Sequence, residues 1–212
     1  MCLPVIQKRV KFAFRICQNK RFMKLPVLAY GFPELNKECS AINKDYPGLK
    51  SLISDMWKTL YAANGAGLAA PQVGRFIKLF IVDTLQAYDN NEYNERDQLI
   101  GDTGIKEVFI NAEIMELSGK SIVAAEGCLS IPDLQIDVER NYSVILKYYN
   151  TDFQERQVLF SGYTARAVLH EFDHTMGRLI TDYTDKEKIK SQLDNISAGK
   201  IKVSYKMKFP NK

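Results

Sequence analysis

The chain has 212 residues, of which 46% are hydrophobic and 25% are charged, a composition typical of one globular domain with a sizeable core. No apolar run approaches the ~20 residues that a membrane span needs, so we expect no membrane partner. The four cysteines, Cys2, Cys17, Cys39 and Cys128, show no paired spacing and follow no secretory signal, which favours a reducing, cytoplasmic setting over a disulfide framework.

The positive charge belongs to the front of the chain. The net charge is +4, from 29 basic and 25 acidic residues, but residues 1–24 hold several lysines and arginines and not one acidic residue. We interpret 1–24 as a poorly ordered basic extension and 25–212 as a single folded domain with a mildly acidic balance. The alternatives are an organellar transit segment, which would change the compartment, and an arm that touches the ribosome or a nucleic acid.

The first part of the domain is predicted to contain one amphipathic helix. An extended segment at 25–28 and a turn at 30–33 lead to a helix over 47–63, in which apolar residues repeat at helical spacing. Asp45 is a plausible cap for it, and Pro47 suits its first turn.

A buried strand and a polar loop are expected next. Residues 76–83 are apolar on both faces of a strand, and the polar stretch 84–105 is predicted to be a solvated surface loop. Short strands follow near 107–111 and around a turn at Ser118 and Gly119.

The last part combines a hairpin with two helices. The remaining predicted elements are strands over 142–149 and 153–160, helices over 164–176 and 185–196, and a strand near 201–209. Thr164 is expected to cap the first of these helices and Gly177 to end it. This order predicts an α+β fold with short, mostly antiparallel strands packed around the helix 164–176.

That helix carries the motif HEFDH at residues 170–174, which contains the only two histidines in the chain. Histidines four residues apart lie on one face of a helix, about one turn apart, so His170 and His174 can bind one metal ion. Glu171 would then lie beside the metal's open position, where a carboxylate can act as a base. The alternative is an ordinary amphipathic helix whose histidines bond backbone carbonyls or face solvent.

A catalytic site of this type needs a third protein ligand and a water. Cys128 is the outstanding candidate, because it lies beside a glycine between a predicted strand and a proline-marked turn. A cysteine in such a place is also often just a small buried hydrophobic residue, and spacing alone does not separate the two interpretations.

Three separated segments together resemble the motifs of peptide deformylases. They are GAGLAAPQ at residues 65–72, EGCLS at 126–130 and HEFDH at 170–174. The resemblance covers roughly residues 25–184 and includes lesser signatures at Gly31, Pro33, Asn111 and Arg140. The chain departs from many members at Leu169, where they have glutamine, and at Ala112, where they have proline. Neither position is an expected ligand, so only local packing is affected.

The resemblance implies the chemistry of the site. Cys128, His170 and His174 would bind one divalent metal, with iron(II) expected first and zinc, nickel or cobalt as alternatives. Glu171 would be the general base. The Gln72 amide and the Leu129 backbone N–H would stabilise the negative charge that develops on the formyl oxygen.

The resemblance also implies how the substrate binds and how the ligands are supported. The expected substrate-binding residues are Gly65, Ala66, Gly67, Gly127 and Ala167, with the glycines allowing a close backbone approach. Glu126 and Arg140 would form an ion pair behind Cys128. Arg166 either belongs to the site or lies on the outer face of its helix, and Asp173 has no assigned role beyond a supporting contact.

The expected function is therefore removal of the N-terminal formyl group from formyl-methionyl nascent polypeptides, a step of protein biosynthesis that releases formate. Its partners are those nascent peptides, with the ribosome as a second candidate and no sequence-specific nucleic-acid binding. An HExxH zinc endopeptidase is the alternative enzyme, disfavoured because the candidate third ligand is a cysteine. A structural metal module or a ribosome-binding module would be non-enzymatic, but a closed metal site needs a fourth protein ligand, and none is evident.

Overall fold

The computed structural model describes residues 23–89 and 102–210. The predictions for the basic extension 1–24 therefore concern residues outside the described ranges, except Met23 and Lys24. The main sheet has the strand order β2-β3-β4-β5-β6, and every neighbouring pair in it is antiparallel. Its strands are β2 (Gly67–Ala69), β3 (Leu79–Asp83), β4 (Lys106–Cys128), β5 (Ile131–Tyr149) and β6 (Glu155–Ser161).

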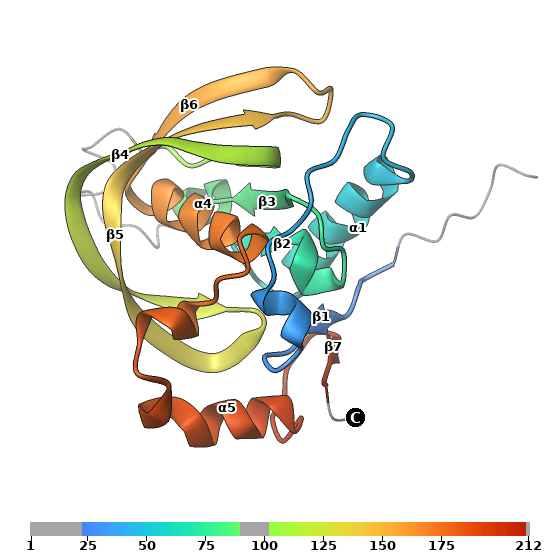
Figure 1. Ribbon diagram of the computed structural model, residues 1–212, viewed down its shortest axis with the longest axis vertical. Coiled ribbons are helices and arrows are strands. Elements are labelled where there is room, and N and C mark those ends of the chain that lie inside the picture. Colours follow the sequence, from blue (N-terminus) through green and yellow to red (C-terminus); the bar gives the residue numbers. More distant parts are fainter. Residues whose placement is uncertain (1–22, 90–101, 211–212) are drawn as a thin grey trace, which may run out of the picture.

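The helices are arranged around this sheet. The α-helices are α1 (Leu49–Ala62), α2 (Leu85–Asp89), α4 (Gly162–Thr175) and α5 (Lys190–Ser197), and the 3-10 helices are η1 (Pro33–Asn36), η2 (Ala70–Val73), η3 (Ile180–Tyr183) and η4 (Lys186–Ile189). Figure 1 shows β4 and β5 curving around α4, which carries the two histidines. The predicted α+β fold around this helix is confirmed.

β3 is buried on both faces because a helix packs on each side of the sheet. Phe80 and Val82 belong to the core cluster that contains α4, whereas Leu79 and Ile81 belong to the cluster that contains α1. Successive side chains of a strand point to opposite faces, so the apolar pattern of β3 follows directly from its central place. The predicted strand is confirmed, with a start three residues later than the pattern suggested.

Two strands are longer than the sequence pattern predicted. β4 spans 23 residues, and β5 spans 19. The turn expected at Ser118 and Gly119 was wrong, because β4 continues past them with only a register shift between Ser118 and Ser121. Gly119 has a φ of 77°, the left-handed conformation that a bulge accepts and that a sequence pattern does not distinguish from a turn.

The start of α1 also differs from the prediction. Gly48, with a φ of 75°, is the N-terminal cap residue, and no side chain caps the helix. The prediction that Asp45 caps this helix was therefore wrong, and Pro47 precedes the cap instead of lying in the first turn. The apolar face was predicted correctly, since Leu52, Met56 and the rest of that stripe are buried.

The start of α4 is fixed from far away in the chain. The buried carboxylate of Asp102 accepts hydrogen bonds from the Thr164 backbone N–H at 2.8 Å and from its hydroxyl at 2.6 Å. Thr164 lies in the first turn of α4, and the N-terminal cap residue is Ser161. The prediction that Thr164 caps this helix was therefore wrong. The predicted solvated loop 84–105 is corrected at two places, because residues 85–89 form the short helix α2 and Asp102 is buried. Residues 103–105 have no helix or strand, as predicted, and residues 90–101 lie outside the described residues.

The end of α4 is closed by Gly177, as predicted. Its φ is 73°, and the Arg178 N–H donates to the Asp173 carbonyl at 2.9 Å, the long-range bond of a Schellman motif. A Cβ atom at this glycine would lie 2.7 Å from the Lys37 carbonyl carbon and 2.8 Å from that of Asn36. The segment after η1 therefore packs directly against the end of the histidine-bearing helix.

The two ends of the described chain meet in a second, two-stranded sheet. β1 (Val27–Leu28) and β7 (Met207–Lys208) pair in parallel, and Figure 1 shows them side by side near α5. Leu28, Ile131, Val138, Leu193 and Ile196 share one core cluster here. In the ranges 23–89 and 102–210, no helix combines the length and the apolar character that crossing a membrane requires.

The packing at Gly177 gives a stability prediction with a matched control. Gly48 has nearly the same φ, 75°, but nothing lies within 4 Å of a Cβ atom added there. Gly48→Ala should cost about 1 kcal/mol of unfolding free energy from backbone strain alone. Gly177→Ala should cost about 2–4 kcal/mol, because overpacking against fixed backbone adds to that strain. Urea denaturation measures both, and equal losses would show that the contact with residues 36 and 37 is unimportant.

Candidate metal centre

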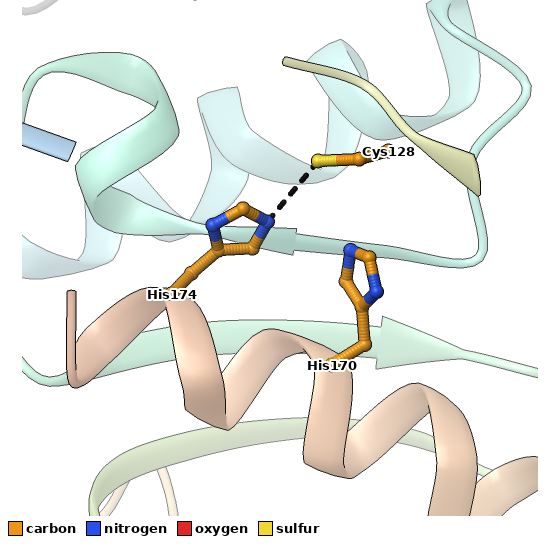
Figure 2. Close-up of side chains that lie close together, drawn as sticks. All are labelled: Cys128, His170 and His174. Atoms are coloured by element: carbon orange, nitrogen blue, oxygen red, sulfur yellow. Dashed lines mark hydrogen bonds between the residues drawn. The ribbon is translucent and has the colours of Figure 1, made fainter. Parts of the chain in front are cut away.

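Three potential metal ligands converge between β4 and α4. Figure 2 shows the Cys128 thiol at the end of β4 turned toward the imidazoles of His170 and His174 on α4. One ligand atom from each residue lies within 4.8 Å of the others. The Cys128 Sγ atom and the His174 Nε2 atom are 3.3 Å apart, close to the roughly 3.5 Å expected for a sulfur and a nitrogen ligand of one tetrahedral metal. The donor set and its spacing therefore fit a bound divalent metal.

Glu126 orients the first histidine. Its Oε2 atom lies 2.9 Å from His170 Nδ1, which leaves the Nε2 atom of that ring available for a ligand bond. A carboxylate behind a metal-binding histidine fixes the ring's tautomer and orientation. Glu126 is buried and is itself held by Arg140, which donates to both carboxylate oxygens at 2.7 and 3.0 Å.

The charges around Glu126 are buried and paired. Burial alone would raise the pKa of Glu126, but hydrogen bonds from His170 and Arg140 outweigh burial and lower this pKa to about 2. Arg166 adds a third partner, donating to Glu126 Oε1 at 2.7 Å and to the Val138 carbonyl at 2.8 Å. Arg166 thus belongs to the site and does not lie on the outer face of its helix. The ion pair expected between Glu126 and Arg140 is present, and both residues are buried.

Asp173 acquires a role that the sequence did not provide. Arg140 donates to its Oδ2 atom at 2.8 Å, and the Tyr183 hydroxyl donates to the same atom at 2.7 Å. The Arg140 guanidinium also lies over the Tyr183 ring, 5.2 Å from its centroid. Arg140 therefore links the carboxylate that orients His170 to the residue that precedes His174.

Glu171 is buried beside the ligands, in close contact with Gly67. Its Oε2 atom has no hydrogen-bond partner among the residues that the structure describes, and burial raises its pKa to about 7. A Cβ atom at Gly67 would lie 2.6 Å from Glu171 Cγ and 2.7 Å from its Cδ. Only glycine fits at position 67, because any side chain there would overlap the Glu171 side chain. The sequence alone did not reveal this contact.

Gln72, in η2, is held with its amide nitrogen toward the ligands. Its Oε1 atom accepts the Ala69 backbone N–H at 2.8 Å. Its Nε2 atom lies 3.6 Å from Cys128 Sγ and 3.3 Å from the Ser130 hydroxyl. The bond from Ala69 therefore determines which end of the amide faces the centre.

A pocket of about 450 Å³ opens onto these residues. Eleven of the thirteen predicted site residues line it: Gly65, Ala66, Gly67, Gln72, Glu126, Gly127, Cys128, Leu129, Ala167, His170 and Glu171. His174 and Arg140 are buried behind its wall. The lining residues not predicted as site residues are Asn64, Ala125, Pro132, Asp133, Tyr163, Arg166 and Tyr205. Most of these flank the three motifs, but Tyr205 follows no motif, and no signal in the sequence marks it.

Comparison with known proteins agrees with this geometry. The family model for polypeptide deformylase matches residues 24–190. The chain belongs to the peptide deformylase family. It is 44% identical to the peptide deformylase of Christiangramia forsetii, with 89% of this chain and 97% of that one covered. It is 42% identical to that of Flavobacterium psychrophilum, with 88% and 97% covered.

Solved deformylase structures share the fold. The peptide deformylase of Thermotoga maritima superposes with a TM-score of 0.63 at 34% identity, covering 76% of this chain and 97% of that one. That of Ehrlichia chaffeensis gives 0.73 at 25% identity, covering 83% and 96%. The expected function as a metal-dependent peptide deformylase, a hydrolase that removes N-terminal formyl groups, is confirmed. The endopeptidase alternative is not favoured.

The contact between Gly67 and Glu171 gives a prediction for this deformylase. Gly67→Ala should retain its metal but lose about 10²-fold in the rate of formate release, because Glu171 must move by about 1 Å to admit the methyl group. Gly48→Ala is the control, since nothing lies within 4 Å of a Cβ atom added there and Gly48 is not among the residues that line this pocket. Metal analysis and a formate-release assay on both variants test this, and unchanged turnover in Gly67→Ala would contradict it.

Proposed function

We propose that Cys128, His170 and His174 hold one divalent metal, and that the site hydrolyses the formyl amide of formyl-methionyl nascent peptides. The observation that carries the proposal is the convergence of a thiol and two imidazoles beside a buried, unpaired carboxylate at the wall of a pocket. A thiolate with two imidazoles suits several soft and borderline metals, and we propose iron(II) first, with zinc, nickel or cobalt as alternatives. When bound, such a metal supplies Lewis acidity that lowers the pKa of water toward neutrality and polarises the formyl carbonyl.

Glu171 is the proposed general base. It takes a proton from the attacking water and delivers it to the leaving amine as the carbon–nitrogen bond breaks, so that formate and a free N-terminus result. Burial of Glu171 and its raised pKa, about 7, support this role, since a catalytic base works best when its pKa lies near the working pH.

The Gln72 amide and the Leu129 backbone N–H are the proposed donors to the formyl oxygen. Charge on that oxygen grows as water attacks, so donors already in place stabilise the transition state more than the substrate. The orientation of Gln72 supports its role, because Ala69 holds the amide oxygen and directs the nitrogen toward Cys128.

The substrate is proposed to lie between the two walls of the pocket. Gly65, Ala66 and Gly67 form one wall, and Gly127 lies at the edge of the other, where open space next to its backbone leaves room for a peptide to pair as an added strand. Ala167 is proposed to line the slot for the methionine side chain, because it lies one turn before His170 and Glu171 on α4.

We propose that Glu126 and Arg140 maintain the ligand geometry without touching the substrate. Residues 25–212 form the proposed catalytic domain, and residues 1–24 a basic extension that catalysis does not need, with a ribosome contact as its alternative role. The proposed compartment is the cytoplasm.

The base is tested by Glu171→Gln. The amide keeps the size of the side chain but cannot accept a proton, so the variant should keep its metal and lose on the order of 10²–10⁴-fold in turnover. Metal analysis and formate release measured on the same preparation check this. Near-normal turnover at full metal content would leave Glu171 with only a structural role.

The proposed substrate is tested with formyl-Met-Ala-Ser and acetyl-Met-Ala-Ser. Formate and a free amine should appear from the first peptide, with its chain intact by mass spectrometry. The acetyl peptide should react far more slowly, because its additional methyl group is placed at the reacting carbon, where a clash costs more than the 10–200-fold typical of a poorly fitting methylene. Internal cleavage, or equal rates on the two peptides, would overturn the proposal.

A further inference from the structure

The turn between β4 and β5 is held by the two ends of the described chain. This turn consists of Leu129 and Ser130. The Ser130 carbonyl accepts a hydrogen bond from the Tyr30 backbone N–H at 2.8 Å. The Leu129 carbonyl accepts one from the Tyr205 hydroxyl at 2.7 Å. Each carbonyl of the turn is thus tied to a different terminal segment.

Tyr205 is well placed to act as a fixed anchor. Directly after it, the Lys206 carbonyl accepts the Val27 N–H and the Lys208 carbonyl accepts the Ala29 N–H, both at 2.9 Å. These bonds belong to the pairing of β7 with β1, which Figure 1 shows at the red end of the chain. The backbone that carries Tyr205 is therefore attached to the segment that leads into Tyr30.

Tyr205 also lines the pocket itself. Its half-buried side chain lines the pocket together with Leu129, Pro132 and Asp133. The residue lies outside the range 24–190 that matches the family model, so family membership assigns it no role.

We propose that Tyr205 is a positioning residue for deformylation: its hydroxyl fixes the turn that carries the Leu129 N–H, and its ring closes one side of the pocket. This inference rests on the proposed role of Leu129 as a donor to the formyl oxygen. The carbonyl that Tyr205 binds and the N–H that is proposed to donate to the formyl oxygen lie in the two peptide planes that meet at the Leu129 Cα atom. Holding one plane therefore leaves the other less freedom to move. A donor that is already oriented stabilises the developing charge without reorganisation.

The test separates the hydroxyl from the ring. Tyr205→Phe removes only the hydroxyl, and Tyr205→Ala removes the ring as well. The matched control is Tyr149→Phe, because the Tyr149 hydroxyl also donates a hydrogen bond, to Glu155 at 3.3 Å, on the hairpin of β5 and β6 and outside the pocket lining. All variants are assayed with formyl-Met-Ala-Ser at equal metal content, and backbone amide exchange is followed by mass spectrometry in a peptide that covers residues 126–133.

Tyr205→Phe should lower kcat by about 2–12-fold with little change in KM, the range expected for the loss of one hydrogen bond. It should also speed amide exchange in the turn. Tyr205→Ala should raise KM in addition, because the pocket loses a wall. Tyr149→Phe should change none of these quantities.

Two outcomes overturn the inference: wild-type kcat and exchange in Tyr205→Phe, or an equal loss of kcat in Tyr149→Phe. Failure of the proposed function looks different, because the unaltered protein would then release no formate from the peptide. Amide exchange reports on the tether between Tyr205 and the turn even in that case.

Discussion

The buried carboxylate of Glu126 joins the elements that form the metal centre. It lies on β4, receives hydrogen bonds from Arg140 on β5, and contacts both Arg166 and His170 on α4. A buried charge is costly unless it is paired and hydrogen-bonded, and here each carboxylate oxygen has two partners. The carboxylate can therefore stay ionised inside the protein and hold one ligand ring in a fixed orientation. Loss of Glu126 would leave two arginines and a histidine without their common partner.

The same network reaches the second histidine indirectly. Arg140 bridges Glu126 and Asp173, and Asp173 precedes His174 on α4. Both ends of α4 are also held in place. Asp102 accepts a hydrogen bond from the first turn of the helix, and Gly177 ends it. The spacing of the two histidines is an intrinsic property of the helix, but their distance from Cys128 depends on where that helix is placed against β4.

Periodicity and motif spacing were sufficient to predict the local elements that carry the chemistry. Each of these elements is formed by residues close together in sequence, so short sequence patterns predict it. They are the histidine helix α4, the hairpin of β5 and β6, and the apolar stripe of α1. The three motifs also identified most of the pocket lining. Contacts between distant residues were not predictable in this way. Asp102 caps a helix that begins 60 residues later, Gly67 leaves room for Glu171, and Tyr205 reaches a turn 76 residues earlier. The local sequence pattern also predicted a turn at Gly119 where the structure has a β-bulge, because both features use the same left-handed glycine conformation.

The central claim is that Cys128, His170 and His174 together hold the one metal of this deformylase. Its most direct test compares the metal content of Cys128→Ala with that of Cys39→Ala, both purified without oxygen. Cys39 is the natural control, because it is also buried, and burial raises its pKa to about 11 and so keeps its thiol protonated. About one metal per chain is expected in Cys39→Ala and far less in Cys128→Ala, since a site of three protein ligands that loses one is both weaker and misshapen. One full metal equivalent in Cys128→Ala would contradict the claim.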